Sequence, residues 1–298
     1  MRVADDLAVL RDGRLIASGQ RDAFDIDRMI ALMIGRSIEQ LYPGRSSAAL
    51  PDTLLVTRNL GARGLIKDVN LTLHAGEVLG LFGLMGSGRT ELARILFGLD
   101  RFDTGDIHIG GQPATHSSPR RSIGRGLAFV TENRREEGLL MDMQIVDNMT
   151  LAVLPNFGVT PLQFVRPERL RSEAGRIADA VRIKAASITQ PARSLSGGNQ
   201  QKVVLAKWLM TEPAVFIMDE PTRGVDVAAK HEIYSIIDRL AGSGGGVLFI
   251  SSEIEELIAM CDRILIMSRG EIVDCFDQSA FDKERILRAA FREQVVAA

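Results

Sequence analysis

Short apolar runs alternate with longer amphipathic segments along most of the chain. The runs have the length of buried strands, and in the longer segments apolar residues recur at helical spacing. Strand–helix alternation of this kind predicts an α/β core with a largely parallel sheet. The predicted pairs are EVLGLFG (77–83) then TELARILFG (90–98), AVFIMDE (214–220) then AAKHEIYSIIDRLAG (228–242), and GVLFIS (246–251) then EIEELIAMC (253–261).

The first residues of the chain resemble residues near its end. ADDLAVLRDGRLIASG (4–19) matches CDRILIMSRGEIVDCF (261–276) in its apolar pattern, and six identities share one offset of 257 positions. A repeat with this period predicts a tandem array of whole domains, although two hairpins of similar composition could also produce it. We therefore expect residues 1–45 to be the tail of a first copy plus a linker, LYPGRSSAALPD (41–52), and residues 46–298 to be a second copy. The identical pairs are Asp5/Asp262, Gly13/Gly270, Ala23/Ala280, Phe24/Phe281, Asp25/Asp282 and Arg28/Arg285.

Composition excludes several classes of protein. The chain has 298 residues and a net charge of -2, so no general electrostatic attraction to nucleic acid is expected. Its two cysteines form neither a metal pattern nor a disulfide framework. No run approaches the ~18 apolar residues of a membrane span, and charges occupy the start, where a signal peptide is apolar. A cytoplasmic protein that could dock on a membrane partner is expected.

The loop GLMGSGRT (83–90) joins the first predicted strand to the first predicted helix. It matches the phosphate-loop pattern G-x-x-x-x-G-K-[ST] except at Arg89, where the pattern has lysine. Backbone N–H groups of such loops converge on phosphate oxygens, and the helix that follows adds a favourable dipole. A tight turn with a solvated arginine is the alternative. The residues expected to hold phosphates are Gly83, Gly86, Ser87, Gly88 and Arg89.

Two acidic residues and one hydroxyl are candidates for magnesium and water chemistry. Thr90 is placed to ligate Mg²⁺. Asp219 and Glu220 follow a fully apolar strand, where α/β sheets keep functional groups. We expect Asp219 to hold Mg²⁺ and Glu220 to be the catalytic residue that orients or deprotonates the attacking water. A helix cap is the alternative for this acidic pair.

The segment LSGGNQQKVVLAKWLM (195–210) is the most specific feature of the chain. It resembles LSGGQ, the signature motif of ATP-binding cassette ATPases, with Asn199 in the last place. Ser196, Gly197 and Gly198 precede a predicted helix, so their N–H groups and hydroxyl can meet a γ-phosphate presented by another domain. A plain helix start is the alternative reading.

Several motifs together resemble the tandem-cassette ATPases of bacterial monosaccharide importers, of the ribose, xylose and galactose type. The match covers GLMGSGRTEL, VTENRREEGLL, LSGGNQQK and DEPTRGVDVAAKHEIY, all similar to the second cassette of that family. The resemblance implies a P-loop NTPase-type sheet with an antiparallel β edge and an inserted helical subdomain, here about 133–194. It also implies ATP and Mg²⁺ as cofactors, Asp226 in the D-loop, Glu132 near the glutamine-loop position and Ser252 where most cassettes have histidine.

The departures from the family pattern imply an asymmetric protein. Arg89 keeps the charge of the lysine but not its compact shape, and Ser252 cannot act as the histidine does. We expect this site to bind nucleotide, to hydrolyse it slowly, and to lend its intact signature to the site of a first cassette.

The resemblance also implies partners and a location. The expected partners are membrane permease subunits, contacted by the helical subdomain, a first cassette missing from this chain or made separately, and, indirectly, a periplasmic sugar-binding protein. The protein would then lie peripherally on the cytoplasmic face of the inner membrane. A solvated helical insertion, a nucleoside-type importer ATPase and a non-transport nucleotide-binding cassette protein are the alternatives.

Overall fold

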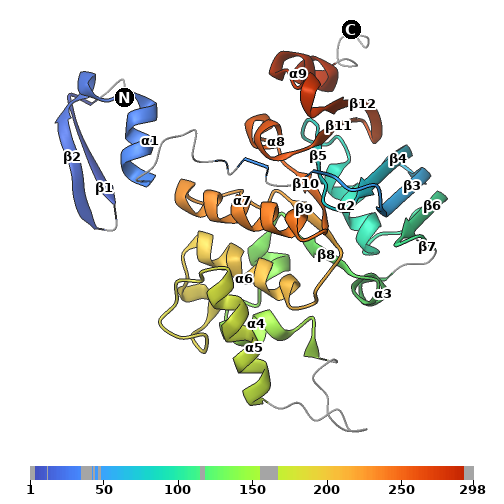
Figure 1. The fold of residues 1–298 in the computed structure, drawn as a ribbon, viewed down its shortest axis with the longest axis horizontal. Helices are drawn as coiled ribbons and strands as arrows, with labels where there is room; N and C mark the ends of the chain where they lie inside the picture. Colours follow the sequence, from blue (N-terminus) through green and yellow to red (C-terminus); the bar gives the residue numbers. More distant parts are fainter. Residues whose placement is uncertain are drawn as a thin grey trace.

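A six-stranded sheet forms the centre of the protein. The computed structural model describes residues 4–11, 13–34, 42, 44–45, 48–114, 118–154 and 167–291. Five neighbouring strands of the central sheet run parallel, and only the edge strand is antiparallel, which confirms the predicted sheet (Figure 1). In sheet order the strands are β12 (Glu271–Asp277), β11 (Arg263–Ser268), β5 (Val78–Phe82), β10 (Gly246–Ile250), β9 (Val215–Asp219) and β8 (Leu127–Val130).

Helices cover this sheet because its inner strands are apolar throughout. Every residue of β5, β9 and β10 is buried, as expected of parallel strands packed on both faces. One helix follows the phosphate loop and packs on β8 and β9, and another packs on β5 and β10. The helices packed on the sheet include α2 (Arg89–Phe97), α3 (Pro119–Gly124), α7 (Val227–Gly242), α8 (Ile254–Met260) and α9 (Lys283–Phe291).

A second, fully antiparallel sheet lies beside the first (Figure 1). Its hydrogen-bonded order is β4-β3-β6-β7, and register shifts interrupt the pairing of its longest strand. The tip of its first hairpin reaches the central sheet, because the N–H of Lys67 donates to the carbonyl of Gly270. The strands are β3 (Thr53–Ala62), β4 (Ile66–His74), β6 (Thr104–Ile109) and β7 (Gln112–Pro113).

Three helices form a layer at the other side of the central sheet (Figure 1). The predicted helical subdomain, about 133–194, contains two of them, which pack on each other and on the helix that follows the signature motif. This stretch opens with a π-helical turn, Arg134–Gly138, a rare form that is frequent at functional sites. The three helices are α4 (Ile145–Thr150), α5 (Pro167–Ala180) and α6 (Gly197–Leu209), and a 3₁₀ turn, Ala192–Ser194, precedes α6.

The repeat found in the sequence is also a repeat of structure. The first unit forms its own two-stranded sheet and stands at one side of the molecule (Figure 1). Each of its elements begins and ends 257 positions before an element at the end of the chain, and even the register shift after Val9 recurs after Ile266. The corresponding pairs are β1 (Asp6–Arg11) with β11, β2 (Arg14–Gln20) with β12, the 3₁₀ turn Arg21–Ala23 with Gln278–Ala280, and α1 (Ile26–Ile34) with α9.

The stretch predicted to be a linker is fastened to the second copy. Arg45 is nearly buried, with 6% of its side chain exposed, and its guanidinium forms ion pairs with Asp238 and Asp262 and donates to the carbonyl of Gly76. The ring of Tyr42 packs on Tyr234, with centroids 5.2 Å apart. Removing one member of a buried ion pair is strongly destabilising. The contacts of Tyr42 and Arg45 therefore fix these two residues on the second copy.

Among the residues that the structure describes, none of the helices combines the length and the apolar character needed to cross a bilayer.

Candidate functional site

The phosphate loop connects β5 to α2 in a compact turn. Gly86 and Gly88 have φ angles of 77° and 102°, in the left-handed region that glycine adopts without strain. Gly83 allows a close approach, because a Cβ atom there would lie 2.3 Å from the carbonyl oxygen of Met267. The N–H of Gly270 donates to the carbonyl of Ser87, which ties the loop to the turn between β11 and β12. Only glycines at these positions permit this loop conformation.

Within the part of the chain that the structure describes, two buried oxygens at this site make no hydrogen bond. They are Oγ of Ser87 and Oδ2 of Asp219, which closes strand β9. A buried oxygen without a hydrogen bond is costly, so each of them points to a ligand. The hydroxyl of Thr90 is near enough to the Asp219 carboxyl group to lower the pKa of that carboxyl. The structure therefore brings the two predicted magnesium ligands together.

This oxygen set fits Mg²⁺. Magnesium is usually held by one or two carboxylates together with substrate phosphates and water, and not by a cage of protein side chains. In agreement, no group of three or more His, Cys, Asp or Glu side chains gathers into a metal site within the described ranges. Asp219 and Thr90 would hold the ion, and the ion would neutralise phosphate charge when bound.

Glu220 lies between the two residues at which the chain departs from the family pattern. Oε1 of Glu220 is 3.4 Å from Nη1 of Arg89, and Ser252 Oγ donates to Oε2 at 3.1 Å. The side chain of Glu220 is 9% exposed, and its backbone is strained at a φ of 48°. Burial raises the pKa of Glu220, while Arg89 and Ser252 lower it. A general base gains from such a raised pKa, but the arginine here occupies one of its oxygens.

The signature residues take part in a second group of contacts, which is separate from the contacts of the phosphate loop. Ser196 is the N-cap of α6, and its hydroxyl accepts a bond from the Asn199 side chain instead of capping the helix. Gly198 packs on the D-loop, since a Cβ atom there would lie 2.5 Å from Cβ of Ala229. Asp226 accepts the N–H of Ala229 and so caps α7. The sequence-predicted D-loop and signature therefore meet within one chain.

Glu132 contacts the D-loop and not the phosphate loop. It forms an ion pair with Arg223. Next to it, Arg134 donates to the carbonyls of Arg223 and Gly224, and a Cβ atom on Gly197 would lie 2.9 Å from Nη2 of Arg134. Burial, and then the charge of Arg135, lower the pKa of Arg134. Sequence reasoning missed this arginine, and the only signal for it was the charged run NRREEG (133–138).

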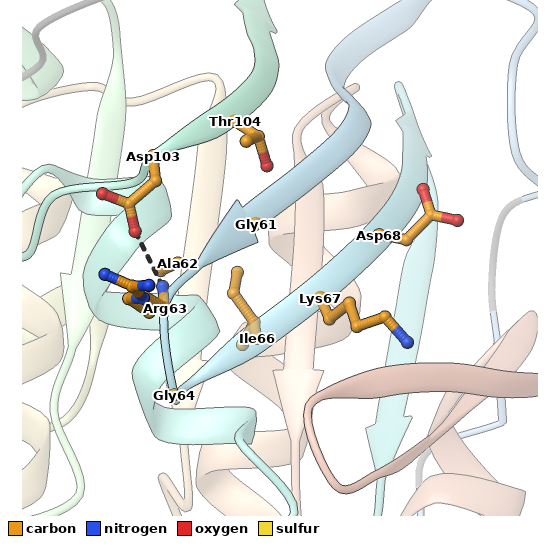
Figure 2. A pocket seen from close by; sticks show the side chains of 9 residues that line it. All are labelled: Gly61, Ala62, Arg63, Gly64, Ile66, Lys67, Asp68, Asp103 and Thr104. Atoms are coloured by element: carbon orange, nitrogen blue, oxygen red, sulfur yellow. Dashed lines mark hydrogen bonds between the residues drawn. The ribbon is translucent and has the colours of Figure 1, made fainter.

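A pocket of about 450 Å³ opens beside the phosphate loop, at the tip of the β3–β4 hairpin (Figure 2). The carbonyl of Leu65, in that hairpin turn, would lie 3.2 Å from a Cβ atom on Gly88. None of the nine residues drawn in Figure 2 is aromatic. Arg63 extends along the pocket, and its N–H donates to Asp103.

Comparison with known proteins gives the family. Residues 66–223 match the family model described as ABC transporter. The chain is 45% identical over 289 residues to a ribose import ATP-binding protein of Rubrobacter xylanophilus and 43% identical over 288 residues to a putative ribose/galactose/methyl galactoside import ATP-binding protein of Pseudomonas fluorescens. Each match covers 97% of this chain but 55% of the relative, so the chain spans about half the length of these relatives.

Solved structures show the same fold. A nucleotide-free ATP-binding cassette from an ABC transporter superposes with a TM-score of 0.68, over 82% of this chain and 98% of that one, at 22% identity. The cassette MJ0796 bound to ADP and phosphate superposes with a TM-score of 0.67, over 76% of this chain and all of that one, at 20% identity. The fold is thus that of an ATP-binding cassette. Since the family model matches more than half of its residues, the chain belongs to the ABC transporter family.

Proposed function

We propose that this protein is the ATP-binding and ATP-hydrolysing subunit of a bacterial monosaccharide importer. The convergence of the phosphate loop with the unpartnered oxygens of Ser87 and Asp219 carries the proposal, because these groups suit a magnesium nucleotide. The names of the relatives, ribose and galactose import proteins, support the class of cargo.

In this proposal each residue has a defined role. The N–H groups of the loop from Gly83 to Gly88 cradle the phosphates, and Arg89 contacts them from the start of α2. Asp219 and Thr90 hold Mg²⁺, and Glu220 orients and deprotonates the attacking water once its contact with Arg89 is broken. Ser252 positions Glu220 through their hydrogen bond. The nucleotide base enters the pocket of Figure 2, where Arg63 can stack on it in place of an aromatic ring.

The proposed organisation is a second cassette, residues 46–298, preceded by the end of a first cassette, residues 1–45. The structural repeat supports it, since β1, β2 and α1 reproduce the last elements of the cassette. The signature residues Ser196–Asn199 then face the nucleotide held by the first cassette, and Asp226 and Glu132 shape the same face. Permease subunits would dock on the helical layer, on the cytoplasmic side of the membrane, with a periplasmic sugar-binding protein acting through them.

Nucleotide binding is the direct test of the proposal. Titration of the protein with a fluorescent ATP analogue is expected to show one site per chain whose affinity increases with Mg²⁺. Arg89→Ala should weaken this binding by about tenfold or more, because a charge-assisted contact to phosphate is lost. Arg176→Ala is a control, since Arg176 lies on α5, is 64% exposed and pairs with Glu173. The absence of binding by the unaltered protein would refute the proposed function.

Magnesium binding is expected to depend on pH through Asp219. Burial raises the pKa of Asp219 to about 6. Below that pH the carboxyl group is protonated and must lose its proton before it ligates the ion. The gain in ATP affinity from Mg²⁺ should therefore shrink by up to about tenfold per pH unit below pH 6, in addition to the change caused by protonation of the γ-phosphate itself. Asp219→Asn should leave only the change that the γ-phosphate causes, and an equal pH dependence in Asp219→Asn and the unaltered protein would contradict the assignment.

A further inference from the structure

A fully buried carboxylate lies behind the candidate catalytic residues. Glu256, on α8, has no exposed surface, and its carboxylate oxygens contact four polar side chains. Thr222 Oγ1 lies 2.9 and 2.8 Å from its two oxygens, Ser251 Oγ donates at 2.8 Å, and the Tyr234 hydroxyl donates at 2.6 Å. The Lys230 ammonium is 2.7 Å away and supplies the balancing charge. Nothing in the local sequence distinguishes this glutamate from its neighbours.

The four partners belong to the segments that carry the site. Thr222 follows Glu220 by two residues, and Ser251 immediately precedes Ser252, which donates to Glu220. Lys230 and Tyr234 lie on α7, whose N-cap is the D-loop residue Asp226. The Glu256 carboxylate is thus bonded to three segments: the one that carries Glu220, the one that carries Ser252, and the helix that the D-loop residue Asp226 caps.

The energetics point to positioning and not to stability as the reason for this arrangement. A buried ion pair recovers its desolvation cost only with excellent geometry and further hydrogen bonds, and an apolar cluster of similar volume is often as stable. Networks in which every member is satisfied fix a single geometry. The Tyr42 ring packs on Tyr234, and so adds a contact to this network.

We propose that Glu256 is a positioning residue, which holds Glu220, Ser252 and the D-loop in one arrangement through Thr222, Ser251, Lys230 and Tyr234. This inference rests on the proposed function, because it concerns the residues that would act on ATP. Glu256 does not touch the substrate. It fixes the two segments between which Glu220 lies, so its loss lets Glu220 move relative to Arg89 and Ser252.

The division between binding and chemistry reports this role. A variant that only weakens the fold lowers the fraction of folded protein, whereas a variant that misplaces Glu220 slows the hydrolysis of bound ATP and leaves the MgATP dissociation constant unchanged. Single-turnover hydrolysis and equilibrium binding of MgATP, both measured on the full chain, separate the two.

Three variants separate positioning from charge. Glu256→Gln removes the charge and weakens all four bonds. Thr222→Val keeps the charge of Glu256 and removes only its bond to the Glu220 segment. Glu253→Gln is the matched control on the same side of the network, because Glu253 pairs with Lys230 at 2.6 Å but is 55% exposed and touches neither Thr222 nor Tyr234 in the described contacts.

We expect the single-turnover hydrolysis of bound ATP to slow by about 10- to 100-fold in both Glu256→Gln and Thr222→Val, with the MgATP dissociation constant preserved, and to stay unchanged in Glu253→Gln. Thr222→Ser keeps the hydroxyl and should restore the rate. Should Glu256→Gln not fold, Thr222→Val still answers the question.

Two results would overturn the inference. If neither variant slows the hydrolysis of bound ATP while the unaltered protein turns over, Glu256 does not position Glu220. If only Glu256→Gln does so, Glu256 acts through its charge alone. Failure of the unaltered protein to bind MgATP would instead refute the proposed function.

Discussion

Changing Arg89 to lysine and Ser252 to histidine together is expected to raise the ATP hydrolysis rate of this protein by roughly 10²- to 10⁴-fold, the usual contribution of a positioned acid–base group or transition-state donor. In the structure, Arg89 reaches Glu220 and Ser252 bonds its other oxygen. A lysine would present a compact ammonium to the phosphates and leave Glu220 free to act on water. A histidine would add a donor toward the γ-phosphate.

Both substitutions suit their surroundings. Lysine is smaller than the arginine it replaces, whose side chain is 13% exposed, and Ser252 is exposed, so a larger ring has room. The assay should cover a range of protein concentrations, because a second chain would have to supply the signature. Adding Glu220→Gln to the double variant should abolish the gain. An unchanged rate in the double variant would show that Arg89 and Ser252 do not limit hydrolysis.

The inner strands of the central sheet were accessible to sequence reasoning, whereas its edge strand β8 and the second sheet were not. Strands β5, β9 and β10 are uniformly apolar, so short buried runs followed by helical periodicity were sufficient to predict them. Strand β3 pairs with β6, about fifty residues away, and register shifts break its alternation of apolar and polar residues. Strand β8 has only four residues. Pairing between distant segments, and not local pattern, forms these strands.

The candidate site likewise contains some residues that sequence reasoning could find and others that it could not. The phosphate loop, the acidic pair at the end of β9 and the start of α6 are each contiguous in sequence, and the structure gives them the predicted surroundings. Contacts with remote segments, and not local sequence, define the structural roles of Arg134, Glu256 and Arg45. Glu256 stands in a helix with two other glutamates close by, and burial alone distinguishes it. Periodicity could not have indicated which of the three lies inside.

Adding a separately made first cassette to this protein is expected to yield ATP hydrolysis that depends on Ser196. The part of the Rubrobacter xylanophilus ribose import relative that lies outside its match to this chain can be tested as that cassette. In the proposed arrangement, Ser196 and the N–H groups of Gly197 and Gly198 face the γ-phosphate on the other cassette. Ser196→Arg should reduce the joint activity by about 10²-fold or more, because donors to a transition state are replaced by a bulky side chain.

The fold should tolerate that change, so a loss of activity would report on the site itself. Ser196 is exposed, and its hydroxyl makes only the bond from Asn199 among the described contacts. Ser194→Arg is the matched control, since Ser194 is also exposed, lies two residues earlier and bonds only to its own turn. Because the signature acts across two chains, Ser196→Arg should leave MgATP binding to this protein alone unaltered. If the joint activity survives Ser196→Arg, the signature does not face the nucleotide of the first cassette, and the division of labour between the two halves is wrong.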